Sequence, residues 1–126
     1  MSRFLLVCLG GAVGTGARYL LSGWILAVAG TRFPWGTLMV NVLGSFLLGV
    51  VAEIGVTTAA IPPTLRVAIA TGALGGFTTY STFNYETLQS MQAGAFGAAV
   101  ANILATVAGC LLAGLAGVAL VRWLMA

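Results

Sequence analysis

The fold is decided by residues 71–86, which read TGALGGFTTYSTFNYE. They lie inside an apolar segment of 29 residues, 64–92. As one helix this segment would be roughly 43 Å long, whereas the core of a bilayer is only about 30 Å thick. Its middle holds three glycines and six hydroxyl-bearing residues, at 71 and 78–82. A helix that simply faces lipid would have no use for them, so the segment must do more than anchor the chain.

The glycines and hydroxyls of this segment predict a helix that is broken near Gly75 and Gly76. Backbone groups freed by such a break would have to face protein, water or an ion rather than lipid. The alternative is an unbroken helix that crosses a neighbour closely at its glycines, with the hydroxyls bonded to their own backbone. Because both features occur together and are followed by Glu86, we favour a functional site.

The composition of the whole chain is that of a membrane protein. Hydrophobic residues make up 60% of its 126 residues, charged residues make up 6%, and the mean hydropathy is +1.10. These values predict a single all-α domain, residues 1–126, with about four membrane-spanning helices and the lipid bilayer as its surroundings.

The charged and reactive residues exclude several classes of function. The five arginines are scattered and form no basic patch, so nucleic acid is not an expected partner. The chain has no histidine, and therefore no ready general base at neutral pH, so we expect no enzyme. Cys8 and Cys110 lie in different apolar segments without metal-ligand spacing and are interpreted as packing residues.

Four apolar segments are expected, at 4–28, 36–56, 64–92 and 95–124. In the first, Gly10 and Gly14 leave one face without side chains, so that a neighbouring helix can approach closely. Arg18 continues that face, and it either lines an aqueous vestibule or snorkels to the membrane surface beside Tyr19. In the fourth, small residues at positions 101, 105, 109, 113 and 117 form a second close-packing stripe.

Polar residues follow helical spacing in the other segments. Thr37, Asn41 and Ser45 share one face of the second helix. Beyond the expected break, Tyr80 and Phe83 are i, i+3 neighbours beside the row formed by Thr78, Thr82 and Glu86. The fourth helix carries the row formed by Asn102, Thr106 and Cys110. Glu53 is close to the end of the second segment and is expected at the membrane interface, as is the pair Arg122 and Trp123.

The polar rows and the arginines together predict an oligomer. Four short helices can hardly enclose a pore and also bury these rows. In a four-span chain Arg3, Arg66 and Arg122 fall on one side of the membrane, with Arg32 and Arg18 on the other. A bias of three to two is too weak to fix one orientation, and a chain that inserts both ways could form an antiparallel homodimer.

Three stretches of the chain resemble those of the bacterial fluoride channel family, often called Fluc. They are GGAVG at 10–14 leading to Arg18, PWGTL at 34–38 leading to Asn41, and the opening stretch 71–86. The resemblance covers essentially the whole chain, and the third stretch is the most specific. It implies a fluoride-selective channel of the bacterial inner membrane that exports fluoride passively. The family's subunits have four helices, the third one broken, and pair as a dual-topology antiparallel homodimer around a structural sodium ion.

The resemblance also implies roles for particular residues. Backbone carbonyls of Gly75 and Thr78 from both subunits would hold the sodium ion, and Asn41 would line the pore. Tyr80 and Phe83 would occupy the aromatic positions of the pore. The remaining residues would form a polar track: Ser81, Thr82, Glu86, Thr106 and Cys110.

Two residues depart from the family pattern. Tyr80 stands where phenylalanine is commoner, and Cys110 stands where a serine is expected.

A second hypothesis for the function is a small dual-topology, proton-coupled exporter of organic cations, with Glu86 or Glu53 as the coupling carboxylate. The polar rows are mostly hydroxyl and amide, which favours the path for an anion.

Overall fold

The computed structural model describes all 126 residues, and every regular element is a helix. Three helices are long and apolar enough to cross a membrane: α1 (Ser2–Ala29), α2 (Trp35–Thr57) and α6 (Phe96–Met125). Between α2 and α6 the chain forms α3 (Pro63–Val67), η1 (Ala68–Leu74), α4 (Gly75–Phe77) and α5 (Tyr80–Gln92). The expected all-α fold is therefore confirmed.

The helices end where local chemistry stops them. Gly30 follows α1 with φ 80°, and Gly94 lies in the turn before α6 with φ 75°. Both are left-handed backbone conformations that glycine adopts without strain. Pro63 opens α3, where a missing N–H leaves no hydrogen bond unmade.

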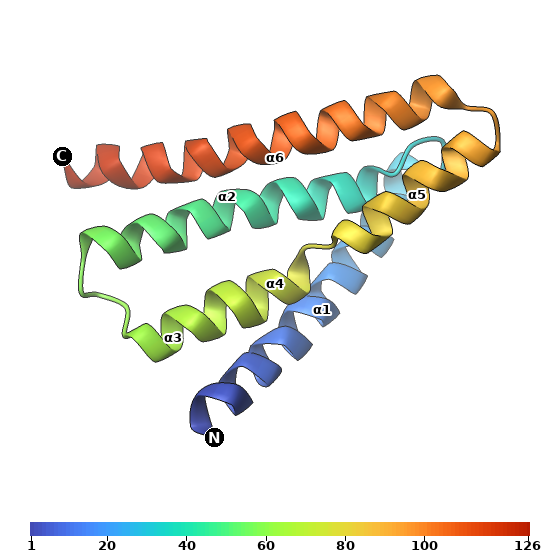
Figure 1. Cartoon of the computed structure of the whole chain (residues 1–126). Helices are drawn as coiled ribbons and strands as arrows, with labels where there is room; N and C mark the ends of the chain where they lie inside the picture. The colour runs from blue at the N-terminus through green and yellow to red at the C-terminus, as the bar shows by residue number, and fades with distance from the viewer.

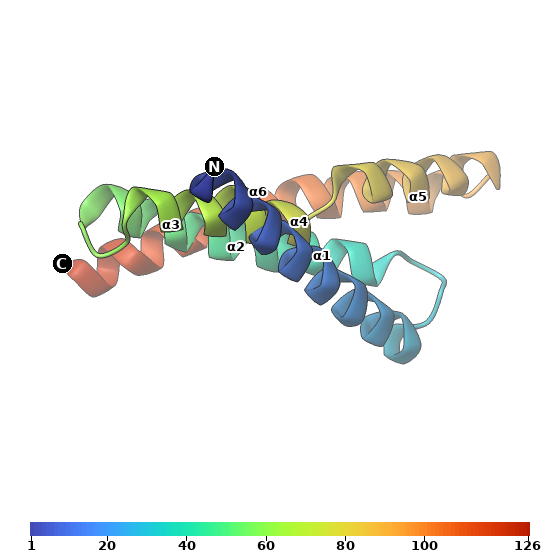
Figure 2. The ribbon, with the colours of Figure 1, turned by 90° about the horizontal axis from the view of Figure 1, so that it is seen from below.

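The four segments run alternately in opposite directions. Helices α2 and α6 lie side by side and run the same way, while α3, η1, α4 and α5 run back against them (Figure 1). Helix α1 crosses obliquely and packs on η1 and α4, as the second view shows (Figure 2). Helix α5 diverges from α1 and lies against the first turns of α6.

The third segment is broken, but not where the sequence predicted. Gly75 and Gly76 remain helical, and the break lies at Thr78 and Thr79. Thr79 has an extended backbone with φ −153° and ψ 114°, and its hydroxyl accepts a hydrogen bond of 3.2 Å from the Thr82 N–H, which caps α5. The seven residues of η1 before it are π-helical, a widened form often found near functional sites.

The predicted position was wrong because the glycines serve helix contact rather than helix breaking. A Cβ on Gly76 would lie 2.6 Å from the Gly11 carbonyl oxygen, and one on Gly10 would lie 2.6 Å from the Ala68 carbonyl oxygen. A Cβ on Gly14 would overlap the Ala73 carbonyl group. The expectation that Gly10 and Gly14 form a close-packing face is thus confirmed, and their partner is the third segment.

Helices α2 and α6 also meet through glycines. A Cβ on Gly117 would run into the Phe46 carbonyl, and one on Gly49 would run into the Gly114 carbonyl. Gly109 faces Val42, but Ala101, at the other end of the predicted small-residue stripe, is exposed. The stripe is therefore a contact surface only over its later part.

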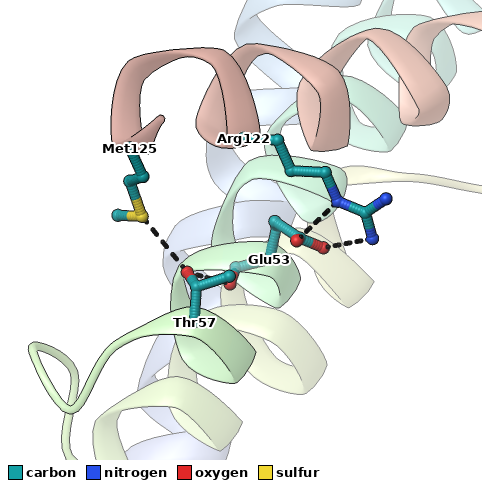
Figure 3. A network of polar contacts seen from close by, with 4 residues as sticks. All are labelled: Glu53, Thr57, Arg122 and Met125. Carbon is teal, nitrogen blue, oxygen red and sulfur yellow. Dashed lines mark hydrogen bonds and ion pairs between the residues drawn. The ribbon is translucent and has the colours of Figure 1, made fainter.

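An ion pair joins the far ends of α2 and α6 (Figure 3). Arg122 Nε lies 2.8 Å from Glu53 Oε1, and Arg122 Nη2 lies 3.5 Å from Glu53 Oε2. The Thr57 hydroxyl lies 2.8 Å from the Glu53 carbonyl oxygen and 3.2 Å from the Met125 sulfur. Glu53 is only 9% exposed, and its guanidinium partner makes this burial tolerable. The interfacial position that the sequence predicts for Glu53 stays a prediction.

Few residues are buried within a single chain. Only 18 of 126 are, and large apolar side chains such as Leu9, Val13, Leu111 and Leu115 lie on the outside. In water they would form an extended apolar surface, whereas in a bilayer they can face lipid tails or another membrane helix.

We predict that Gly14→Leu destabilises the fold by about 1–3 kcal/mol, the usual cost of overpacking a tight contact. The matched control is Gly16→Leu, because no atom lies within 4 Å of a Cβ built at Gly16. Denaturant unfolding in detergent micelles, followed by tryptophan fluorescence, measures both variants. Equal stability of the two variants would contradict the close contact of α1 with η1 and α4.

Candidate functional site

Asn41 holds the break in the third segment together. Its Nδ2 donates to the Thr79 carbonyl oxygen at 3.0 Å, and its Oδ1 accepts from the Thr79 N–H at 2.7 Å. Asn41 is buried, at 7% exposed, so these groups have little access to water. The side-chain amide thus supplies both hydrogen bonds that the extended peptide at Thr79 cannot obtain from a helix.

Arg18 binds the end of the broken helix. Its Nε donates to the Gly76 carbonyl oxygen at 3.0 Å, and the Thr15 hydroxyl donates more weakly to the same oxygen at 3.4 Å. A positive charge is favourable there, because the last carbonyls of a helix carry partial negative charge. The two predicted alternatives for Arg18, a vestibule or snorkelling, both omitted this contact.

The break also frees backbone carbonyl oxygens. In a continuous helix the Thr79 N–H would donate to the Gly75 carbonyl, but here it donates to Asn41. The Thr82 N–H, which would reach the Thr78 carbonyl, donates to the Thr79 hydroxyl instead. Free carbonyl oxygens are suitable ligands for a hard cation. No cluster of three or more His, Cys, Asp or Glu side chains exists in the structure.

A hollow of about 410 Å³, here called the break cavity, opens beside these residues. Its wall carries the rings of Tyr80 and Phe83, whose centroids are 5.4 Å apart in a T-shaped arrangement at 63°. The predicted neighbour relation of the two rings is confirmed. The break cavity also has these polar lining residues: Asn41, Ser45, Thr78, Thr79, Thr106 and Cys110.

A second hollow of about 610 Å³, here called the Glu86 cavity, lies between α1, α2 and α5. The Thr37 hydroxyl donates to Glu86 Oε1 at 2.8 Å, while Glu86 Oε2 is buried and has no hydrogen-bond partner. Thr82 also lines this cavity.

The structure divides the predicted polar track between the two cavities. Thr82 and Glu86 line one, whereas Thr106 and Cys110 line the other. Ser81 is exposed, with its Oγ 3.3 Å from the Thr79 hydroxyl oxygen. The spacing argument that put Thr78 in one row with Thr82 and Glu86 was wrong, because the break interrupts the helix between Thr78 and Thr82.

Sequence reasoning also missed a buried polar contact between α6 and α5. Asn102 Nδ2 donates to the Thr87 hydroxyl at 2.9 Å, linking α6 to α5. Asn102 belongs to a predicted polar row. The only sequence signal for its partner Thr87 is that Thr87 lies one helical turn after Phe83. Only the packing of α5 on α6 brings the two together.

A family model described as CrcB-like protein, Camphor Resistance (CrcB), matches residues 5–118. The chain belongs to the CrcB family. Three CrcB relatives carry the name fluoride-specific ion channel FluC. The protein of Anaeromyxobacter sp. (strain K) is 57% identical over 124 residues, which is 98% of each chain. That of Sorangium cellulosum is 51% identical over 126 residues, covering 100% of this chain and 99% of its own. That of Geobacter sulfurreducens is 48% identical over 124 residues, covering 98% of this chain and all of its own.

CrcB membership confirms the family resemblance inferred from the three sequence stretches. With three helices able to cross a membrane, this CrcB chain is a multi-pass integral membrane protein.

We predict that Arg18→Leu destabilises the CrcB fold by about 1.5–3 kcal/mol, because it removes a charged donor from the Gly76 carbonyl. The control is Arg32→Leu, which removes an exposed arginine that makes no hydrogen bond within the chain. Thermal unfolding in micelles compares the two variants with the wild type. If Arg18→Leu behaves like Arg32→Leu, the contact with Gly76 does not hold the helix end.

Proposed function

We propose that this protein is a fluoride-selective channel that lets fluoride leave the bacterial cytoplasm passively. The observation that carries the proposal is the break cavity, whose polar lining offers amide and hydroxyl groups and no charged side chain. The names of the family relatives support fluoride as the permeating ion.

Neutral donors suit a small anion that must pass quickly. Fluoride is firmly hydrated, so a narrow pore has to replace its water by N–H and O–H groups. A fixed cation at the narrowest point would hold the anion too long, because conduction needs weak and multiple sites. Asn41 has two amide N–H groups, and its contact with Thr79 uses one of them, so the other is free to face the break cavity.

The aromatic rings add a second kind of contact. The edge of an aromatic ring carries partial positive charge, so ring edges can face an anion without binding it as tightly as a cation would. We assign this role to Phe83 and Tyr80, and expect them also to narrow the passage against chloride. The phenol of Tyr80 leaves the ring edge in place, so the departure from phenylalanine is compatible with the role.

The other residues of the polar track extend the path on both sides of the aromatic pair. We place Thr106 and Cys110 along the break cavity, and Thr82 and Glu86 along the Glu86 cavity, with Ser81 between them. Arg18 would raise the positive potential of the vestibule at the mouth of the path, because its Nε–H contact with Gly76 leaves the rest of the guanidinium free.

The membrane potential is sufficient to drive export. A potential of 100 mV, negative inside, favours the exit of one negative charge by about 2.3 kcal/mol, or roughly fifty-fold in concentration. Fluoride that enters as HF and ionises in the cytoplasm would otherwise be trapped there. The pore must reject chloride, because a chloride leak would dissipate the same potential.

The exporter of organic cations has no comparable support. Glu53 is committed to Arg122 at the far end of α2, and Glu86 accepts from Thr37 at the side of α2. The break cavity itself has no carboxylate in its lining.

We also propose that the channel is an antiparallel homodimer with a sodium ion between its subunits. The large apolar surface, the weak arginine bias and the break cavity at the surface of one chain support a second copy. The carbonyls of Gly75 and Thr78, which have lost their helical donors, would hold the ion together with the same groups of the partner. The sodium ion would add positive potential without standing in the path of fluoride.

We predict fast fluoride efflux and little chloride efflux from vesicles that contain the purified protein. Valinomycin and a potassium gradient set the potential, and ion-selective electrodes measure both anions. Fluoride efflux should follow the imposed voltage without a proton gradient. Comparable chloride efflux, or fluoride movement that requires a proton gradient, would falsify the channel proposal.

In the same vesicle assay we predict that Phe83→Ile reduces fluoride efflux, whereas Tyr80→Phe is tolerated, because it keeps the ring edge.

Replacing all sodium by N-methylglucamine should lower the dimer fraction or the fluoride flux. Size-exclusion chromatography and the electrode assay measure the two effects, with potassium as the matched control for ionic strength. A dimer and a flux that both survive exhaustive exchange would count against the sodium site. A particle of one-chain mass that still conducts fluoride would count against the dimer.

A further inference from the structure

We propose that Asn102 is a positioning residue that acts through Thr87 to fix the rotation of α5 and hence the place of Phe83 on the wall of the break cavity. The proposal rests on the channel function above and adds a determinant of chloride rejection that lies behind the cavity wall.

Few other contacts within the chain fix the orientation of helix α5. It has thirteen residues, begins after the extended peptide at Thr79 and ends at the turn before α6. It diverges from α1 and lies along the start of α6 (Figures 1 and 2). Its side chains Tyr80, Tyr85 and Leu88 are largely exposed, so apolar packing within the chain fixes it only weakly.

A directed series of hydrogen bonds ties α6 to the backbone of α5. The Thr106 hydroxyl donates to Asn102 Oδ1 at 3.4 Å, and Asn102 Nδ2 donates to the Thr87 hydroxyl at 2.9 Å. The Thr87 hydroxyl in turn donates to the Phe83 carbonyl oxygen at 2.8 Å. Thr87 has one proton, so accepting from Asn102 leaves it able to make this bond.

Burial makes the loss of any of these hydrogen bonds costly in free energy. Asn102 is 1% exposed and Thr87 is 6% exposed, so neither can replace a lost partner with bulk water. An unpaired polar group in such a place is costly, which favours the one rotation of α5 that keeps the bonds intact.

A second contact fixes the same helix from another side. Glu86, the residue before Thr87, accepts from Thr37 on α2 at 2.8 Å. Successive residues point about 100° apart around a helix axis, so the two contacts hold α5 from different directions. Phe83 lies one turn before Thr87 on the same face, is 6% exposed and lines the break cavity.

The consequence is a link between a buried amide and selectivity. Without the contact between Asn102 and Thr87, α5 can turn about its axis and carry the Phe83 ring, together with Tyr80, away from the α2 and α6 residues on the facing wall of the break cavity. The passage then widens at the place where chloride is rejected, although no residue of the cavity lining has changed.

The test compares Thr87→Val with Thr87→Ser. Valine keeps the shape of threonine and removes the hydroxyl, whereas serine keeps the hydroxyl and loses only a methyl group. In the vesicle assay we expect Thr87→Val to lower the ratio of fluoride to chloride efflux about ten-fold, the effect of one lost buried hydrogen bond. Thr87→Ser should stay near the wild-type ratio. Asn102→Leu should lower the ratio at least as much as Thr87→Val, because it also removes the acceptor of the Thr106 hydroxyl. The double variant should be no worse than Asn102→Leu, because both substitutions remove the contact between Asn102 and Thr87.

Ser90→Ala is the control, since the Ser90 hydroxyl also donates to the carbonyl four residues earlier, that of Glu86, but makes no hydrogen bond to α6 and does not line the break cavity. An unchanged ratio in Thr87→Val, an equal loss in Thr87→Ser, or an equal loss in Ser90→Ala would each overturn the proposal.

A second measurement does not depend on transport. In a Cys8→Ser background, Cys110 reports on the break cavity through its rate of reaction with a small methanethiosulfonate reagent. We expect Thr87→Val to change this rate several-fold and Thr87→Ser to leave it unchanged. If the wild type carries no fluoride, the channel proposal fails, and the reaction rate alone decides the positioning role: equal rates in all variants would overturn it.

Discussion

Two hydrogen bonds from the side chain of Asn41 allow a helix to stop in the middle of an apolar span. Within a bilayer, an extended peptide without partners would leave a donor and an acceptor unsatisfied, at a cost of several kcal/mol each. Asn41 meets both groups of Thr79, at 2.7 and 3.0 Å, and it does so from a neighbouring helix. The break therefore depends on two helices, because α5 starts directly after the peptide that Asn41 of α2 satisfies.

Glycines, charged side chains and neutral polar side chains have different roles around this break. Glycines of α1 and of the third segment bring the backbones of η1 and α4 close to α1, which places the Gly76 carbonyl within reach of Arg18. The charged group of Arg18 thus satisfies a helix end, and Glu53 and Arg122 pair with each other at the far end of α2 and α6, while amides and hydroxyls line the break cavity. Such a division keeps fixed charge out of the lining and leaves neutral donors in it.

Hydropathy and residue spacing were enough to predict the four segments, the close contact at Gly10 and Gly14, and the aromatic pair of Tyr80 and Phe83. They misplaced the break, because glycine serves both as a helix breaker and as a contact residue, and only the presence of Gly11 opposite Gly76 separates the two roles. The pairs of Asn41 with Thr79 and of Asn102 with Thr87 were out of reach, because they join residues on different helices. The roles of Gly75, Ser81 and Cys110 came from the family resemblance and not from their spacing.

A high-resolution structure of the Asn41→Leu variant in lipid tests the dependence on Asn41 most directly. Leucine has a similar size and cannot bond to the Thr79 peptide. Our account predicts that α5 shifts or that the break closes into a helix, while α1 keeps its glycine contacts with η1 and α4. An unchanged α5, with Thr79 still extended and bonded to no other side chain, would contradict it.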